Sequence, residues 1–297
     1  MRIAAAAGLT NTGHKRRRNE DSFVCRAPLF AVADGMGGAQ AGEVASRLAA
    51  AAVGEAAADS SGEVAVADLV AEANRRVWQL STQDMSHSGM GTTITIALAD
   101  LAGGTIAFGH VGDSRAYRIR DGALDQLTED HSLVAELVRR GRLSPEEAEA
   151  HPQRSVITRA LGTDPEVEVD LFTVEALPGD LFLLCSDGLT TMVSDEEILS
   201  LAEESPGDLD AAVRALVNAA NAAGGEDNIT VVAFKLAEGD APAQETAVAD
   251  VEAAPAPEAP TVEMRRHGAL PGGRLGAFAA IAGTGIAALL LVWGLNH

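Results

Sequence analysis

The pattern of apolar and polar positions predicts intermixed strands and helices over residues 1–237. Short apolar or alternating runs, rich in β-branched residues and broken by glycine turns, are typical of strands. Such runs cover residues 3–8, 21–25, 29–33, 92–98, 105–111, 116–119, 123–127, 167–174, 180–185 and 229–236. Apolar spacing of three and four residues predicts helices at 42–57, 64–80, 132–140, 144–150, 194–203 and 209–223. The mostly antiparallel order of the strands indicates an α+β layered domain.

Local signals support several of these boundaries. Gly62, between the first two helices, is expected to end the first one. Ser144, followed by Pro145, has the pattern of a helix N-cap. Ser194, with Glu197 three residues later, predicts a capping box at the start of another helix.

The pattern changes after residue 237. Gly, Pro, Ala, Glu and Thr dominate residues 238–272, with little aliphatic bulk, which predicts a disordered acidic linker. Residues 273–297 form a third part, in which residues 275–295 carry no charge. A run of about 21 such residues is long enough to cross a bilayer.

The charges around this apolar run indicate an orientation. Arginines precede it and no Lys or Arg follows, so the positive-inside rule places the larger N-terminal part in the cytoplasm. The sequence thus predicts a single-pass protein of the cell membrane. The alternative interpretation is a buried apolar helix of the globular domain. The arginines are Arg265, Arg266 and Arg274.

Composition narrows the class of partner. The chain is 47% hydrophobic but only 3% aromatic, so its core must be aliphatic. A net charge of -21 argues against nucleic acid, which requires clustered cations. One basic stretch, Lys15 to Arg18, stands out in this acidic chain and is either a solvated loop or an anion site. Cys25 and Cys185 lie in apolar strands and are expected to be reduced core residues.

Four acidic turns share one environment, the junction of an apolar strand and a glycine-containing turn. They carry Asp34, Asp113, Asp187 and Asp227. If the strands pair in one sandwich, these carboxylates converge and repel, so cations must neutralise them or some must bind protons. Ligands that are all oxygen atoms favour Mg²⁺ or Mn²⁺. Two such ions can activate a water and clamp a phosphoryl group, which a nearby arginine would hold.

Six motifs in order make the chain resemble the metal-dependent protein phosphatase (PP2C or PPM) family in its bacterial serine/threonine form. The resemblance covers about residues 3–236 and implies a β-sandwich of two antiparallel sheets flanked by α-helices (α-β-β-α), to which the sequence adds a C-terminal transmembrane helix. The motifs are Arg16 to Asp21, Val32 to Gly38, Gly91-Thr92-Thr93, Gly109 to Arg115, Cys185 to Leu189, and Asp227 to Thr230.

The resemblance assigns roles to single residues. It implies that Asp34 bridges two metal ions, that the Gly35 carbonyl binds one of them, and that Asp187 and Asp227 complete the other. Arg16 matches the phosphate-binding arginine of the family. Glu20 and Asp21 match the acidic pair that orients metal-bound waters, and Asp113 matches a ligand of a weaker third ion. Residues 130–162 resemble the flap beside the site, in which Arg154 and Arg159 are candidate substrate contacts.

The chain also departs from the family pattern. Thr191 replaces an acid that supports the third ion, so this third site is expected to be weak. Met36 stands where eukaryotic members carry a histidine proposed as a general acid, and Ala39 where bacterial members often carry one. The remaining histidines are expected to be structural or surface residues rather than catalytic ones. They are His14, His110 and His131.

The resemblance implies hydrolysis of phosphothreonine and phosphoserine on proteins through a water bridged by two Mn²⁺ or Mg²⁺ ions. The expected substrates are a bacterial serine/threonine kinase and its targets, near the membrane because of the apolar C-terminal run. Two alternatives remain. One is a catalytically silent module that binds phosphoproteins, and the other is a phosphatase dedicated to one regulatory protein of the anti-sigma-antagonist type.

Overall fold

The computed structural model describes residues 1–37, 41–55, 61–205 and 207–239. The predicted linker from residue 240 onward and the predicted span at 275–295 lie outside these residues. Among the helices that are described, none combines the length and apolar character needed to span a membrane.

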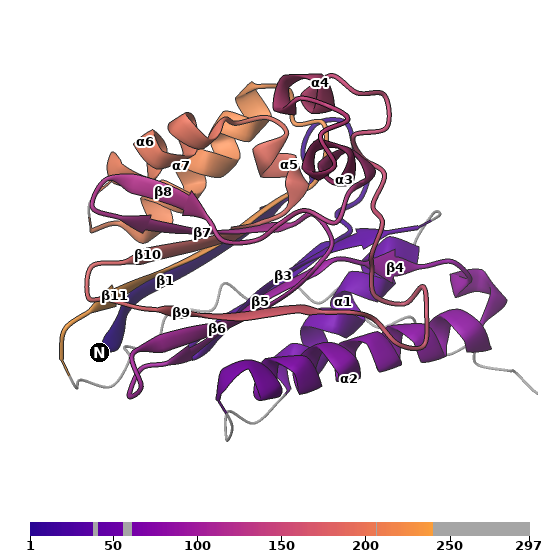
Figure 1. The fold of residues 1–297 in the computed structure, drawn as a ribbon, viewed down its shortest axis with the longest axis horizontal. Helices are drawn as coiled ribbons and strands as arrows, with labels where there is room; N and C mark the ends of the chain where they lie inside the picture. The colour runs from indigo at the N-terminus through magenta and orange to yellow at the C-terminus, as the bar shows by residue number, and fades with distance from the viewer. Residues whose placement is uncertain (38–40, 56–60, 206, 240–297) are drawn as a thin grey trace, which may run out of the picture. The chain divides into compact units, whose positions relative to one another are not determined.

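Two antiparallel sheets form the centre of the fold (Figure 1). Their strands alternate buried and outward positions or are buried on both faces, as expected for sheets covered by helices. The first sheet has the order β1 (Arg2–Asn11), β11 (Ile229–Ala237), β10 (Leu181–Cys185), β7 (Arg115–Arg120), β8 (Ala123–Gln126). The second has the order β2 (Asp21–Arg26), β3 (Leu29–Met36), β5 (Ile94–Asp100), β6 (Thr105–Val111), β9 (Asp170–Glu175), with β4 (Gly91–Thr92) paired to β3.

Helices cover the outer face of each sheet. The helices α1 (Ala41–Gly54) and α2 (Gly62–Gln83) pack on the second sheet. The helices α6 (Asp195–Glu203) and α7 (Leu209–Ala222) lie on the first (Figure 1). The shorter elements are η1 (Met85–His87), α3 (Leu133–Arg139), α4 (Pro145–Glu149) and α5 (Asp187–Thr190). The α-β-β-α sandwich that the sequence predicts is therefore the observed fold.

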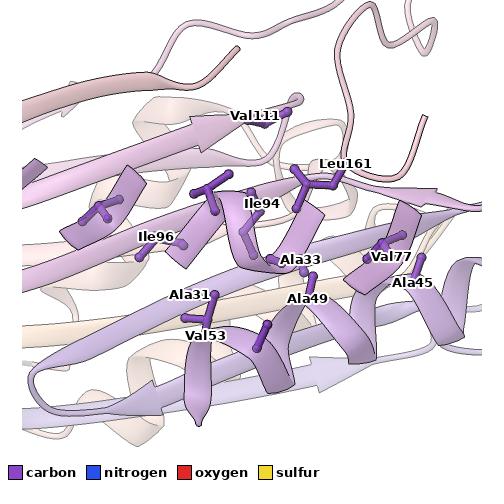
Figure 2. Close-up of a cluster of buried hydrophobic side chains, with 14 of the residues drawn as sticks. Ala31, Ala33, Ala45, Ala49, Val53, Val77, Ile94, Ile96, Val111 and Leu161 are labelled. Atoms are coloured by element: carbon purple, nitrogen blue, oxygen red, sulfur yellow. The ribbon is translucent and has the colours of Figure 1, made fainter. Parts of the chain in front are cut away.

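Apolar layers fill the spaces between these elements. Phe30 of β3, in the second sheet, faces the first sheet. It stacks there on Phe234 of β11, with ring centroids 4.0 Å apart. The next residue, Ala31, points to the opposite face, where Figure 2 shows it with Ala49 and Val53 of α1. Successive side chains of a strand point to opposite faces. The described phenylalanines therefore concentrate between the sheets, and small alanines let α1 approach closely.

The structure corrects several local predictions. The strand predicted at 29–33 does not end there, since β3 continues through Asp34 and Gly35 to Met36. The first helix ends at Gly54, not at residue 57, and Gly62 begins α2 with a positive φ of 82° rather than ending α1. The Asp187-Gly188 turn is a helical turn, α5. The run 92–98 is interrupted at Thr93, between β4 and β5, because the backbone there turns to hydrogen-bond the strand β3.

The flap segment, residues 130–162, carries α3 and α4 and is fastened at both ends. Near its start, the His131 N–H donates to the Gly112 carbonyl at 2.7 Å, and within the segment Ser132 pairs with Ile157 in an isolated bridge. At its end, Leu161 and Thr92 exchange two backbone hydrogen bonds of 2.9 and 3.1 Å. The Asn74 carboxamide of α2 accepts a hydrogen bond from the Gly162 N–H at 2.8 Å. The segment is therefore anchored to β4 and α2 at the point where it rejoins the sandwich.

Candidate metal centre

The predicted acidic residues gather at one end of the sandwich, where strands from both sheets terminate. Asp21 and Asp34 lie opposite each other on β2 and β3. Asp187 follows β10 as the first residue of α5, and Asp227 lies just before β11. Asp34 is surrounded closely enough to experience the charges of the other acids, Asp21, Asp113, Asp187 and Asp227.

Hydrogen bonds to the backbone fix the Asp34 turn, by which we mean Asp34 to Met36 at the end of β3. The Asp34 carbonyl accepts from the Thr93 N–H at 2.9 Å and from the Thr92 hydroxyl at 2.8 Å. The Gly35 N–H donates to the Glu20 carbonyl at 3.0 Å. A Cβ on Gly35 would collide with the carbonyls of Glu20 and Gly42, the second residue of α1. Glycine is thus required here because α1 and the Glu20 loop approach the strand closely.

Burial and mutual repulsion raise the pKa of these carboxyl groups. Loss of solvation is the largest cause at each group, and neighbouring carboxylates add to it. The pKa of Asp21 and of Asp113 rises to about 7, that of Asp187 to about 6, and that of Asp34 lies well above its usual value. Burial also raises the pKa of Glu20. The centre therefore favours binding of a proton or a cation.

Several buried oxygens in the centre lack a hydrogen-bond partner. They are Asp21 Oδ1, Asp113 Oδ1 and Asp187 Oδ1. The other oxygen of Asp21 accepts from the Thr230 hydroxyl at 2.6 Å and from the Ser186 hydroxyl at 2.8 Å. Buried polar atoms normally have partners. These oxygens therefore fit a hard cation such as Mg²⁺ or Mn²⁺, which prefers oxygen ligands.

The carboxylates lie close together but do not form a complete set of metal ligands. In the part of the chain that the structure describes, no group of three or more His, Cys, Asp or Glu side chains is arranged to hold a metal ion. Asp227 instead binds Arg16, whose Nη2 lies 2.6 Å from Asp227 Oδ2. The Arg16 side chain is 54% exposed, so its guanidinium borders both the acidic centre and solvent.

One positioning residue carries no role in the sequence analysis. The Asn228 side chain accepts from the Glu20 N–H at 2.7 Å and donates to the carbonyls of Thr12 and Arg18, both at 2.9 Å. It therefore fastens the basic stretch to the turn that carries Asp227. Asn228 follows Asp227 directly in the motif Asp227 to Thr230. Its position after the Gly224-Gly225 turn is the sequence feature that could have indicated a positioning role.

The flap arginines contact acidic neighbours. Arg154 lies 3.8 Å from Glu226, the residue before Asp227. Arg159 binds Asp170 at 2.6 Å. These contacts bring the flap segment to the rim of the centre through Arg154 and hold its far end on β9 through Arg159.

The buried histidines, His110 and His131, have hydrogen-bond partners at both ring nitrogens. The rings of His110 and His131 lie 4.8 Å apart between β6 and the flap segment. His131 Nδ1 accepts from the Gly112 N–H, and its Nε2 contacts Asp170 Oδ2, each at 3.0 Å. Both nitrogens of His110 also have partners, Thr95 and the Glu129 carbonyl. His14 is exposed.

A sandwich of two antiparallel sheets between helix pairs, with an acidic centre of oxygen ligands at one end, defines the architecture of the metal-dependent protein phosphatases. Comparison with known proteins agrees, since residues 13–232 match the protein phosphatase 2C family. The chain belongs to the protein phosphatase 2C family.

Similar proteins are bacterial. The serine/threonine protein phosphatase PstP of Mycobacterium tuberculosis is 45% identical over 237 residues, which cover 79% of this chain but only 45% of PstP. The serine/threonine phosphatase stp of Listeria monocytogenes is 39% identical over 75% of this chain and 92% of its own length. The protein phosphatase PhpP of Streptococcus pneumoniae is 42% identical over 78% of this chain and 98% of its own.

Solved structures resemble the fold as well. The M. tuberculosis PstP/Ppp crystal structure has a TM-score of 0.74 and 41% identity, and the match covers 79% of this chain and 99% of that one. A crystal structure of the PstP catalytic domain in complex with two manganese ions has a TM-score of 0.72 and 40% identity, over 79% and 98% of the two chains. The resemblance that the motifs indicate is thus confirmed.

Proposed function

We propose that this protein is a metal-dependent serine/threonine protein phosphatase that hydrolyses phosphothreonine and phosphoserine on proteins. The observation that carries the proposal is the cluster of buried acids whose oxygens Asp21 Oδ1, Asp113 Oδ1 and Asp187 Oδ1 have no partner. The relatives named serine/threonine phosphatases, and the PstP structure with two manganese ions, support the same activity.

Different residues of the centre would bind the metal ions and the phosphate. Asp34, Asp187, Asp227 and the Gly35 carbonyl would hold two divalent ions, Mn²⁺ or Mg²⁺, and Asp113 a weaker third. When bound, such ions lower the pKa of a shared water and offset charge on the phosphoryl oxygens. Arg16, half exposed beside Asp227, would bind the phosphate through its planar donors.

Glu20 and Asp21 support this arrangement. Asp21 is held by the hydroxyls of Thr230 and Ser186, which leaves its second oxygen free to accept from a water in the centre. The Glu20 backbone is fixed through Gly35 and Asn228, so its carboxylate stays beside the Asp34 turn. Both groups would therefore orient water rather than move with substrate.

The substrates are proposed to be phosphorylated proteins, in particular a serine/threonine kinase and its targets. A silent phosphoprotein-binding module is the second candidate, and a phosphatase dedicated to one regulatory protein is the third. The described acidic centre carries every acid expected of the two-ion site, Asp34, Asp187 and Asp227, which favours catalysis over binding alone.

The apolar C-terminal run supports a proposal on location. Residues 275–295 would anchor the chain in the cell membrane once, with the phosphatase domain in the cytoplasm. Fractionation of cells that express the full chain tests this proposal. Recovery from the soluble fraction would contradict it, and recovery from membranes, with residues 1–237 sensitive to protease only after lysis, would support it.

The activity is tested on the full chain, purified in detergent. We expect phosphate release from a phosphothreonine peptide with Mn²⁺, loss of release with EDTA, and recovery when Mn²⁺ is restored. Full activity in metal-free buffer would overturn the mechanism. Peptide binding without phosphate release would favour the binding module, and activity on one phosphoprotein but no peptide would favour the dedicated phosphatase.

A further inference from the structure

Thr93 joins two of the acidic turns through one hydroxyl group. Its Oγ1 accepts from the Asp34 N–H at 2.9 Å, and it lies 2.8 Å from the hydroxyl of Ser114, the residue after Asp113. The Thr93 N–H donates to the Asp34 carbonyl at 2.9 Å. Thr93 and Ser114 are both fully buried. A single side chain thus contacts the Asp34 turn and the Asp113 turn, which follow different strands.

Packing holds Thr93 in this place as well. Gly112, with a φ of 114°, leaves a space that the Thr93 side chain fills, so that a Cβ on Gly112 would collide with Thr93. The Ser114 carbonyl lies 3.0 Å from the Thr95 hydroxyl two residues along β5. The Asp113 turn therefore contacts the chain at Thr93, just before β5, and at Thr95 within β5, and its position depends on both.

We propose that Thr93 is a positioning residue that sets the separation of Asp34 and Asp113 and thereby the affinity of the centre for divalent cations. The inference rests on the proposed function, in which these acids bind metal ions. Thr93 touches neither substrate nor metal. It acts through the Asp34 backbone and through Ser114, because each of its hydroxyl contacts goes to one of these two turns.

The hydroxyl rather than the size of the side chain is the decisive feature. Valine has nearly the same shape, so Thr93→Val keeps the packing against Gly112. It would leave the Asp34 N–H without an acceptor and Ser114 without its partner. Serine retains the hydroxyl and loses only a methyl group. Comparing the two variants therefore separates positioning by hydrogen bonds from simple filling of space.

The experiment is a calorimetric titration of Mn²⁺ into the full chain, purified in detergent and stripped of metal. We expect Thr93→Val to weaken Mn²⁺ binding by about 5- to 20-fold, a range that corresponds to loss of one or two hydrogen bonds. Thr93→Ser should bind Mn²⁺ within about twofold of the unchanged protein, since it keeps both bonds.

Thr128 provides a matched control. Its hydroxyl also accepts a backbone hydrogen bond, from the Ala116 N–H at 3.1 Å, and the residue is buried with 4% exposure. Thr128→Val therefore removes a comparable bond, which goes to β7 three residues beyond Asp113, without touching Asp34, Thr93 or Ser114. We expect it to lower the melting temperature as Thr93→Val does, but to leave the Mn²⁺ affinity unchanged.

The outcomes are distinct. If Thr93→Val and Thr128→Val affect Mn²⁺ affinity equally, the inference is wrong. If Thr93→Val does not fold, Ser114→Ala decides, because it removes only the bond between the two turns, and unchanged affinity in that variant overturns the inference. Absence of Mn²⁺ binding and phosphatase activity in the unchanged protein would instead overturn the proposed function.

Discussion

Two groups of buried ionisable residues lie near one another and differ in how they are satisfied. In the acidic centre, three carboxylate oxygens have no partner, and burial raises the pKa of Asp21 to about 7. In the histidine pair, His110 and His131 have a partner at each ring nitrogen, and burial lowers the pKa of His110 to about 4. The acidic centre therefore has buried oxygens that could bind a cation, whereas the histidine pair is neutral and has all its ring nitrogens hydrogen-bonded.

The difference separates a binding site from a structural contact. Protein interiors rarely leave polar atoms without partners, because each such atom costs free energy. When an acidic group leaves such oxygens without partners, binding of a cation to them lowers the free energy of the folded protein. The histidine pair has nothing left to bind, although His131 beside Asp170 has the geometry of an acid–base pair. Burial and an unusual pKa alone would not have distinguished the two groups.

The largest expected effect is on catalysis. Asp34→Asn should lower kcat/KM on a phosphothreonine peptide by about 10²–10³-fold or more, because it removes the central charge that holds cations. Asp125→Asn is the control, since this carboxylate is half exposed on β8, where it pairs with Arg118. Activity of Asp34→Asn equal to that of the control would show that the acidic centre is not the active site.

A smaller effect concerns stability without metal. Asp187→Asn should raise the free energy of unfolding in EDTA by about 1 kcal/mol, since it relieves like-charge repulsion and desolvation. His131→Leu should lower it by about 1–3 kcal/mol, because the Gly112 N–H loses its acceptor. Urea unfolding measures both changes. A decrease in both variants would mean that the two groups do not differ as described.

The smallest expected effect is on pH dependence. Asp21 and Asp113, with a folded pKa of about 7 against 3.8 in the unfolded chain, keep protons in the folded state up to about pH 7. Their contribution to stability therefore falls as pH rises from about 4 to about 7. His110 has the opposite sign, since its folded pKa of about 4 lies below 6.5, and its contribution falls as pH drops through that interval.

Between pH 6.5 and 7.5 the two acids dominate the pH dependence, because the contribution of His110 rises by only about 0.3–0.4 kcal/mol over this interval. We expect metal-free protein to lose about 1 kcal/mol over this interval, or about 2–4 °C in melting temperature. Saturating Mn²⁺ should abolish the slope. A calorimetric melting temperature that is flat in EDTA would contradict the raised pKa values.

Much of the fold follows from periodicity that the sequence displays directly. The residues of β3 alternate between two apolar layers, and this alternation is visible as Phe30-Ala31-Val32-Ala33. Local helix signals hold in part, since Ser144 caps α4 with both hydrogen bonds of a capping box, whereas Ser194, where the capping box was predicted, forms only the bond from the Glu197 N–H. Both kinds of signal depend on residues close in sequence.

The arrangement of the centre depends instead on distant residues. The acidic turns and Arg16 could be assigned by resemblance, and the structure brings them together. The contacts that hold these residues in place could not be predicted from the sequence. Ser186 lies 165 positions from Asp21, and Asn228 lies 208 positions from Glu20. No local pattern distinguishes such a serine or asparagine from one on the surface. The metal ligation itself stays a prediction.

The pairing of Thr92 with Leu161 has a consequence for diversity among such enzymes. The two bonds are made by main-chain atoms, so the identity of the side chains in the intervening flap does not enter them. The Thr92 hydroxyl meanwhile bonds to Asp34. Residues 133–156 can therefore be exchanged for another sequence while both junctions remain on the sandwich. Sequence changes in this segment would then leave the backbone pairing at Thr92, and with it the support of Asp34, unchanged.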